Sequence, residues 1–212
     1  MNKTKKTVML AMYCSLAYVA MILGKYIPIA IGFLHYDPKD IIITMAGFTF
    51  GPLSAFLVSV IVSFIEMITV STTGFIGFVM NALGSAAFAC TAAWIYRKKK
   101  NIAGAVAGTV AGTLAMTVVM ILWNYLITPL YLGYTRKVVA AMIPTVFLPF
   151  NLIKGGINAI VTVILFQALK GSINKKINEE KTGHNNVAGP VIISAIIIIT
   201  IVLMILAKFN VI

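Results

Sequence analysis

The feature that most constrains this chain is a series of long segments without a charged side chain. Residues 41–65, 67–96 and 101–135 contain no Asp, Glu, Lys or Arg. An uncharged apolar stretch of about 18 or more residues is typical of a helix that crosses a lipid bilayer. Strands of a membrane β-barrel alternate in polarity, and runs such as residues 192–199 (IISAIIII) do not. The sequence therefore predicts an all-α integral membrane protein.

Composition agrees with this assignment, because 60% of the residues are hydrophobic and 10% are charged, against roughly 25% charged in soluble domains. The net charge of +12 fits basic residues that collect in cytoplasmic loops. No segment is long enough to form the basic folded face that nucleic-acid binding needs. We therefore expect the chain to be surrounded by the lipid bilayer and to bind no nucleic acid. Cys14 and Cys90 are isolated in apolar runs, and we expect neither a disulfide nor a metal site.

Seven apolar segments predict membrane helices, at roughly residues 7–27, 40–50, 52–71, 75–96, 102–128, 140–169 and 187–207. The second segment is too short to cross a bilayer alone. Gly51-Pro52 separates it from the third, because Gly-Pro is a strong turn signal, so we expect its neighbours to bury it. Residues 1–170 would form a six-helix bundle, 171–186 a polar cytoplasmic linker, and 187–212 would hold an additional C-terminal transmembrane helix.

The basic residues predict the orientation of the helices. With a cytoplasmic N-terminus, eleven lysines and arginines lie inside and four outside. The outer four are Lys25, Lys39, Arg136 and Lys137. An alternative arrangement merges residues 40–71 into one helix and places the N-terminus outside. It also leaves an acceptable excess of basic residues on the cytoplasmic side. The Gly-Pro break and the lysines at the N-terminus favour the first arrangement.

Two formal charges fall at membrane depth, Glu66 and Lys154. Ionisable residues in a membrane are costly and are candidates for functional sites. Glu66 lies near the outer end of its helix, from where it can reach water. Lys154 lies near the middle of residues 140–169, too deep for its side chain to reach either surface. We therefore expect Lys154 to bind a ligand or to form an ion pair with Asp40 or Glu66.

Several polar side chains accompany Lys154. Asn151 precedes it by three residues and shares its helix face, which joins an amide to a three-donor ammonium group. Asn124 and Asn81 are further amides within apolar segments, and any one of them alone could equally hold helices together. Asp40 is a favoured N-cap type, so we expect it to cap the second helix and to remain able to contact a ligand.

Other features concern packing and chemistry. Gly104, Gly108 and Gly112 recur at four-residue spacing, which predicts close packing of helices. A second pair of small residues, Ala11 and Ser15, lies on the first helix. The sequence contains no phosphate-binding G-x-x-x-x-G-K-[ST] motif and no Ser/His/Asp or metal-ligand cluster. We therefore expect a protein that is not an enzyme and that holds no metal.

Taken together, the motifs resemble the substrate-capture (S) subunits of energy-coupling factor (ECF) vitamin transporters, and most closely the riboflavin branch of that family. The resemblance runs from about residue 8 to 170. It rests on DPKD at 37–40 with GFTFGP at 47–52, NAL at 81–83, NY at 124–125 with PLY at 129–131, and PFNLIKG at 149–155. Several S subunits share the first two segments, whereas Asn-Tyr and F-N-x-x-K-G are more specific to the riboflavin branch.

The resemblance implies six helices, a vitamin bound near the outer face of a bacterial cytoplasmic membrane, and import driven by a transmembrane coupling protein and two ATPases. It implies these ligand contacts: Asp40, Thr44, Gly47, Asn81, Asn124, Tyr125, Asn151 and Lys154. Ala11 and Ser15 fall where the family has an A-x-x-x-A motif that meets the coupling subunit, and the serine is a mild departure. The extra helix at 187–207 is a larger departure from the six-helix pattern.

The residue chemistry is compatible with riboflavin, which is planar, uncharged near neutral pH and rich in acceptors. Amides match its imide edge, Lys154 can donate to a carbonyl or ribityl oxygen, and Trp123 and Tyr125 can flank the ring. FMN is a related ligand, and we expect no cofactor besides the transported vitamin. An unpaired lysine would equally suit a carboxylate vitamin such as pantothenate. A membrane scaffold whose polar residues only hold helices together is the alternative from a different class.

Overall fold

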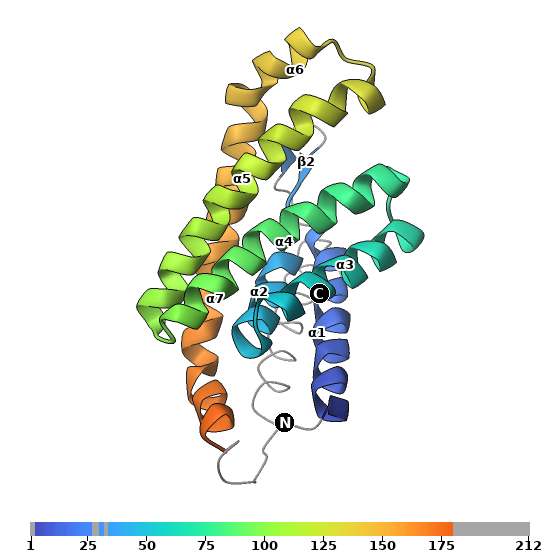
Figure 1. Ribbon diagram of the computed structural model, residues 1–212. Helices are drawn as coiled ribbons and strands as arrows, with labels where there is room; N and C mark the ends of the chain where they lie inside the picture. Colours follow the sequence, from blue (N-terminus) through green and yellow to red (C-terminus); the bar gives the residue numbers. More distant parts are fainter. Residues whose placement is uncertain (1–2, 27–29, 32–33, 180–212) are drawn as a thin grey trace, which may run out of the picture.

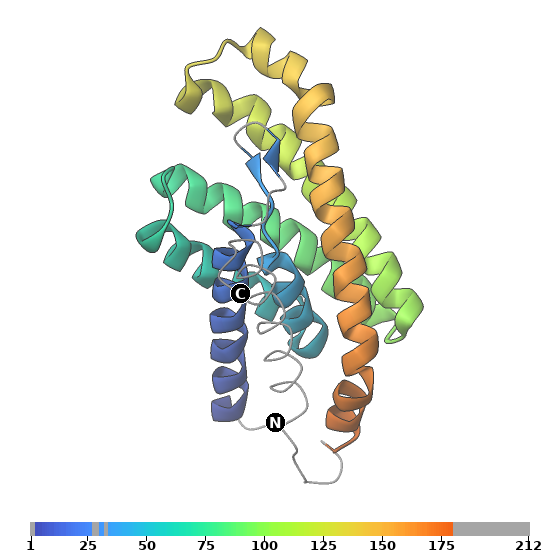
Figure 2. The same cartoon turned by 180° about the vertical axis from the view of Figure 1, so that it is seen from behind.

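The computed structural model describes residues 3–26, 30–31 and 34–179, and these residues form a helical bundle (Figure 1). The helices are α1 (Lys3–Gly24), α2 (Lys39–Phe50), α3 (Pro52–Thr69), α4 (Gly74–Lys98), α5 (Ile102–Leu132), α6 (Arg136–Met142), the π-helix η1 (Ile143–Phe147) and α7 (Leu148–Glu179). Two short antiparallel strands, β1 (Ala30–Ile31) and β2 (Leu34–His35), form a hairpin before α2. The hairpin leads into α2 near the middle of the bundle (Figure 2).

Five helical segments among the described residues are long and apolar enough to cross a membrane: Lys3–Gly24, Pro52–Thr69, Gly74–Lys98, Ile102–Leu130 and Arg136–Leu169. Together with α2 they correspond to the six segments predicted before residue 170. Helix α2 has only 12 residues and is surrounded by α1, α3, α4 and α7. The prediction that its neighbours bury this short segment is confirmed, and so is the all-α membrane fold.

The Gly51-Pro52 break also has the predicted form. Helix α2 ends at Phe50, and Gly51 adopts a φ of 98°, a conformation that residues with a side chain rarely adopt. Pro52 is the first residue of α3, where its missing N–H costs no helical hydrogen bond. The chain therefore forms two helices over residues 40–71, not a single merged one.

The last described helix differs from its predicted limits at both ends. Helical structure begins at Arg136, with the π-helical turn of η1 before α7, instead of near residue 140. At the other end α7 continues through Glu179, so the first part of the segment predicted as a linker is helical. The rest of that linker and the predicted helix at 187–207 lie outside the described residues.

Glycines allow α4, α5 and α7 to pack closely side by side (Figures 1 and 2). A methyl group at Gly108 would lie 2.6 Å from the carbonyl oxygen of Ala92, and one at Gly112 would lie 2.5 Å from that of Phe88. Gly155 brings α7 equally close to α5, because its methyl would lie 2.6 Å from Thr113 Cγ2. The predicted packing role of Gly108 and Gly112 is confirmed.

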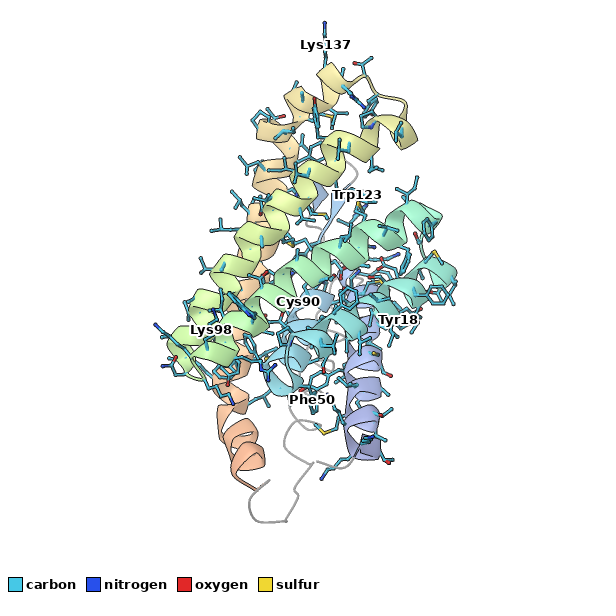
Figure 3. All side chains as sticks on the ribbon, viewed as in Figure 1. Tyr18, Phe50, Cys90, Lys98, Trp123 and Lys137 are labelled. Atoms are coloured by element: carbon cyan, nitrogen blue, oxygen red, sulfur yellow. The ribbon has the colours of Figure 1, made fainter. Side chains whose placement is uncertain are left out.

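The loops divide between two ends of the bundle. The start of α1, the α4–α5 connection and the end of α7 lie at one end, whereas the turn between α5 and α6 lies at the other (Figure 1). Lys98 and Lys137 mark these two ends (Figure 3). The Lys98 ammonium lies 3.5 Å from the centre of the Trp94 ring, a pairing suited to a membrane surface.

The close approach at Gly112 leads to a stability prediction. Gly112→Ala is expected to destabilise the protein by about 1–3 kcal/mol, because the added methyl meets a backbone carbonyl that cannot turn away. Gly156→Ala in α7 is the matched control, since no atom lies within 4 Å of a methyl placed there. Thermal unfolding in detergent would measure both variants. Equal melting temperatures would contradict the close contact of α4 with α5.

Candidate functional site

A network of charged side chains lies inside the bundle, where the start of α2 and the residues just before it meet α3, α4 and α7. It comprises Asp37, Lys39, Asp40, Glu66 and Lys154, and we call these residues the buried charge network. Ion pairs in a low-dielectric interior are retained only when each charge has a close partner and further hydrogen bonds. The contacts of each member therefore define what the site can do.

Lys39 is at the centre of the first half of this network. Its ammonium lies 2.6 Å from Asp37 Oδ2 and 2.6 Å from Glu66 Oε2, and its side chain has no exposed surface. These contacts fasten the start of α2 to α3. The sequence placed Lys39 among the outer basic residues and Glu66 where it could reach water, but both side chains are buried in the protein. The two residues instead compensate each other's charge inside the protein.

Asp37 completes this group and starts helix α2. Its Oδ1 accepts a hydrogen bond from the backbone N–H of Lys39 at 3.0 Å. Burial opposes ionisation of Asp37, but the ammonium groups of Lys39 and Lys154 outweigh burial and lower the pKa of this carboxyl. The prediction that Asp40 caps the helix is therefore wrong. Asp40 makes no capping hydrogen bond and points into the bundle, where it is fully buried.

The second half of the network pairs Asp40 with Lys154. The Lys154 ammonium lies 3.5 Å from Asp40 Oδ2, and the side chains are 16% and 0% exposed respectively. The Ser85 hydroxyl of α4 donates to Asp40 Oδ1. An ion pair with Asp40 was one of the expectations for Lys154, and it is confirmed. Lys154 is consequently not the unpaired lysine on which the pantothenate alternative depended.

Asn158 is a site residue that the sequence reasoning missed. It is fully buried, and its amide accepts a hydrogen bond from the Tyr36 hydroxyl at 2.7 Å. It donates to the carbonyl oxygen of Asp37 and to Asp40 Oδ2, both at 3.3 Å. Burial, together with the carboxylates of Asp40 and Asp37, raises the pKa of Tyr36, so this hydroxyl stays a neutral donor. Asn158 follows Lys154 by one helical turn, and this spacing could have identified it.

The two other buried amides are oriented by bonds within their own helices. Asn124 Nδ2 donates to the Met120 carbonyl and Asn151 Nδ2 to the Phe147 carbonyl, each at 2.7 Å. The Thr128 hydroxyl donates to Asn124 Oδ1 at 2.9 Å. Since an amide group has two N–H donors, each of these side chains keeps donor capacity for a further partner.

The remaining predicted contacts lie in different surroundings. Thr44 is fully buried and donates to the Asp40 carbonyl at 2.6 Å, one turn along α2. Gly47 lies among packed helices, because a methyl there would be 2.9 Å from Ala93 Cβ. Asn81 is partly buried on α4, and Tyr125 is 38% exposed on α5. As contacts to a ligand, all four residues stay predictions.

A methionine-rich apolar cluster lies where α4, α5 and α7 pack together. Its buried members are Phe88, Met116, Met120 and Ala159, with Met80, Ala87, Val119 and Trp123 packed against them. Methionine is flexible and polarisable, and it adapts to flat apolar groups.

Across the described ranges 3–26, 30–31 and 34–179, no group of His, Cys, Asp and Glu is arranged to hold a metal ion.

Ala11 and Ser15 lie on the exposed face of α1. The opposite face of this helix packs into the bundle through Cys14, Ala17 and Met21. The Ser15 hydroxyl donates to the Ala11 carbonyl at 3.1 Å, which satisfies the hydroxyl within the helix and leaves the surface small. This face is thus shaped for close approach of another helix.

Comparison with known proteins supports one family. The family model described as "ECF transporter, substrate-specific component" matches residues 5–166. The chain is 28% identical over 181 residues to "Riboflavin transporter RibU" of Staphylococcus aureus (strain TCH60), which covers 82% of this chain and 95% of the relative. It is 30% identical over 183 residues to "Riboflavin transporter FmnP" of Bacillus subtilis (strain 168), which covers 82% and 96%.

A solved structure has the same architecture. The structure described as "Structure and mechanism of the S component of a bacterial ECF transporter" aligns with a TM-score of 0.69 and 27% identity. The alignment covers 81% of this chain and 99% of that one. The match therefore extends over the whole of the S component's fold. The chain belongs to the family of substrate-specific components of ECF transporters.

Proposed function

We propose that this chain captures riboflavin from the outer side of the membrane and delivers it for import. The observation that carries the proposal is the position of Lys154 on the face of α7 that also bears Asn151. The Lys154 side chain is 16% exposed, whereas the Asp40 carboxylate that pairs with it has no exposed surface. The similarity to two proteins named as riboflavin transporters supports the same substrate.

In the proposed complex, Lys154 donates to a flavin carbonyl or ribityl oxygen. Asn151 and Asn124 each donate one N–H within their own helix. The second N–H of each amide donates to the polar edge of the ring. The methionine-rich cluster and Trp123 offer apolar contact to the ring. We propose Asn81 and Tyr125 as outer contacts, and Thr44 and Gly47 as supports of α2 beneath Asp40.

The alternatives fit the contacts less well. A carboxylate vitamin such as pantothenate would need a free cation, whereas Lys154 already has Asp40 as its counter-ion. A scaffold whose amides only join helices would need bonds between helices from Asn124 and Asn151, and both donate within their own helix. Riboflavin, an uncharged ligand with many acceptors, matches the available donors best. FMN, which shares the ring and ribityl chain and adds an anionic phosphate, is the second flavin candidate.

Replacing Lys154 tests the proposed site. Lys154→Met keeps the length of the side chain and removes its donors, which would weaken riboflavin binding by about ten- to a hundredfold, or roughly 1–3 kcal/mol. Quenching of flavin fluorescence by the purified protein gives the affinities. Lys137→Met, at an exposed position on α6, is the control and should bind as the wild type does. Equal affinities for Lys154→Met and wild type would remove Lys154 from the site.

Import is proposed to require a transmembrane coupling protein and two ATPase chains, and this subunit itself hydrolyses no ATP. The exposed small face at Ala11 and Ser15 is the proposed docking surface for the coupling protein. Ala11→Trp should spare riboflavin binding and abolish uptake, because bulk there holds helices apart. Leu114→Trp, at an exposed position on α5, is the matched control. Uptake by Ala11→Trp cells at the wild-type rate would locate the contact elsewhere.

The proposed orientation in the bacterial cytoplasmic membrane has the N-terminus and the Arg97–Lys100 segment in the cytoplasm. Three exposed basic residues lie toward the proposed outer side, Lys25, Arg136 and Lys137, because Lys39 is buried. Lys137→Cys should react with an impermeant maleimide in intact cells, and Lys99→Cys only after permeabilisation. Both are made with Cys14 and Cys90 replaced by alanine. The reverse labelling pattern would overturn the orientation.

A further inference from the structure

The charge of Lys154 is compensated within the protein itself. The Asp40 carboxylate lies 3.5 Å from the ammonium and has no exposed surface. Asp40 is itself held in place from two other directions, by the Ser85 hydroxyl and by the Asn158 amide. An aspartate fixed by three partners from α4 and α7 cannot turn away when a ligand arrives, so a ligand that reaches Lys154 also meets the field of Asp40.

The remainder of the buried charge network adds to this field. Asp37, Asp40 and Glu66 are three formal negative charges, and Lys39 and Lys154 are two formal positive charges. Their formal sum is a net charge of −1. Lys39 is enclosed by Asp37 and Glu66 at 2.6 Å each and has no exposed surface, so it offers no attraction to a ligand. Lys154 is therefore the cation of the network through which a ligand can be bound.

We infer that Asp40 determines the charge class of the ligand by neutralising Lys154. The inference rests on the proposed function, because it assumes that Lys154 contacts the flavin. With Asp40 in place, Lys154 provides N–H donors to an uncharged acceptor but little net attraction for an anion. Without Asp40, the same ammonium loses its nearest counter-ion and the formal charge of the network rises from −1 to zero, which favours phosphate- or carboxylate-bearing ligands. Asp40 is thus a positioning and specificity-determining residue that acts through Lys154, and its own oxygens need not touch the ligand.

Riboflavin and FMN are a suitable pair of probes, because they share the ring and the ribityl chain and differ by an anionic phosphate. The charge of the phosphate can change the affinity without direct contact between the phosphate and Lys154. At an effective dielectric constant of about 20, one unit charge at about 10 Å changes an affinity roughly tenfold. The wild type is expected to bind riboflavin more tightly than FMN. Asp40→Asn keeps the shape of the side chain and one of its two acceptor oxygens, and removes its charge.

The experiment measures the ratio of the two dissociation constants by flavin fluorescence in wild type, Asp40→Asn, Lys154→Met and the double variant. Asp40→Asn should shift the ratio toward FMN by about tenfold or more. The double variant should lose this shift, because the cation that attracts the phosphate is gone. A merely structural role of Asp40 would weaken both ligands equally and leave the ratio unchanged, which would overturn the inference.

Two further outcomes separate this inference from the proposed function. A wild type that binds FMN as tightly as riboflavin would overturn the role of Asp40 without any variant, which covers the case in which Asp40→Asn does not fold. A wild type that binds neither flavin would instead overturn the proposed riboflavin function. A shift toward FMN that persists in the double variant would assign the selection to another cation and also reject the inference.

Discussion

The interaction on which the rest of this structure depends is the enclosure of Lys39 by Asp37 and Glu66. A lysine without exposed surface in a membrane-embedded bundle is tolerated only because two carboxylates lie 2.6 Å from it. This pairing fixes the start of α2 against α3. Once α2 is fixed, Asp40 must point into the bundle, where Ser85, Asn158 and Lys154 meet it. The geometry of the candidate site thus follows from how one buried charge is compensated.

In the proposed complex, the site would offer a charged group to an uncharged ligand. An ammonium group provides strong hydrogen-bond donors, but alone it would attract any available anion. Pairing Lys154 with Asp40 retains the donors and cancels the net charge. The amides of Asn151 and Asn124 complement this arrangement. Each donates one N–H to the carbonyl group one turn back, which fixes its orientation, and keeps a second N–H for another partner. Such prior ordering lowers the entropic cost of binding.

The helical fold was predictable from sequence because lipid imposes a simple length and polarity rule on each segment. The Gly51-Pro52 break and the packing at Gly108 and Gly112 were predictable for similar local reasons. The burial of Lys39 was not, because nothing in its neighbours along the chain reveals that Glu66, distant in sequence, would lie beside it. Lys154 was singled out as a charge at membrane depth and Asn151 by its place on the same helix face, whereas Asn158 was overlooked although its spacing obeys the same rule.

Helix α7 carries this site and continues well past it. Its 32 residues span about 48 Å, whereas the hydrocarbon core of a bilayer is about 30 Å thick. The chain from Lys154 to Glu179 is therefore one continuous helix about 37 Å long, with the lysine of the candidate site at one end. A tilt of about 10° at the lysine would displace the far end by roughly 6 Å. By lever geometry alone, a rearrangement of that size around Asp40 would displace the end of α7 by about as much as one helical turn.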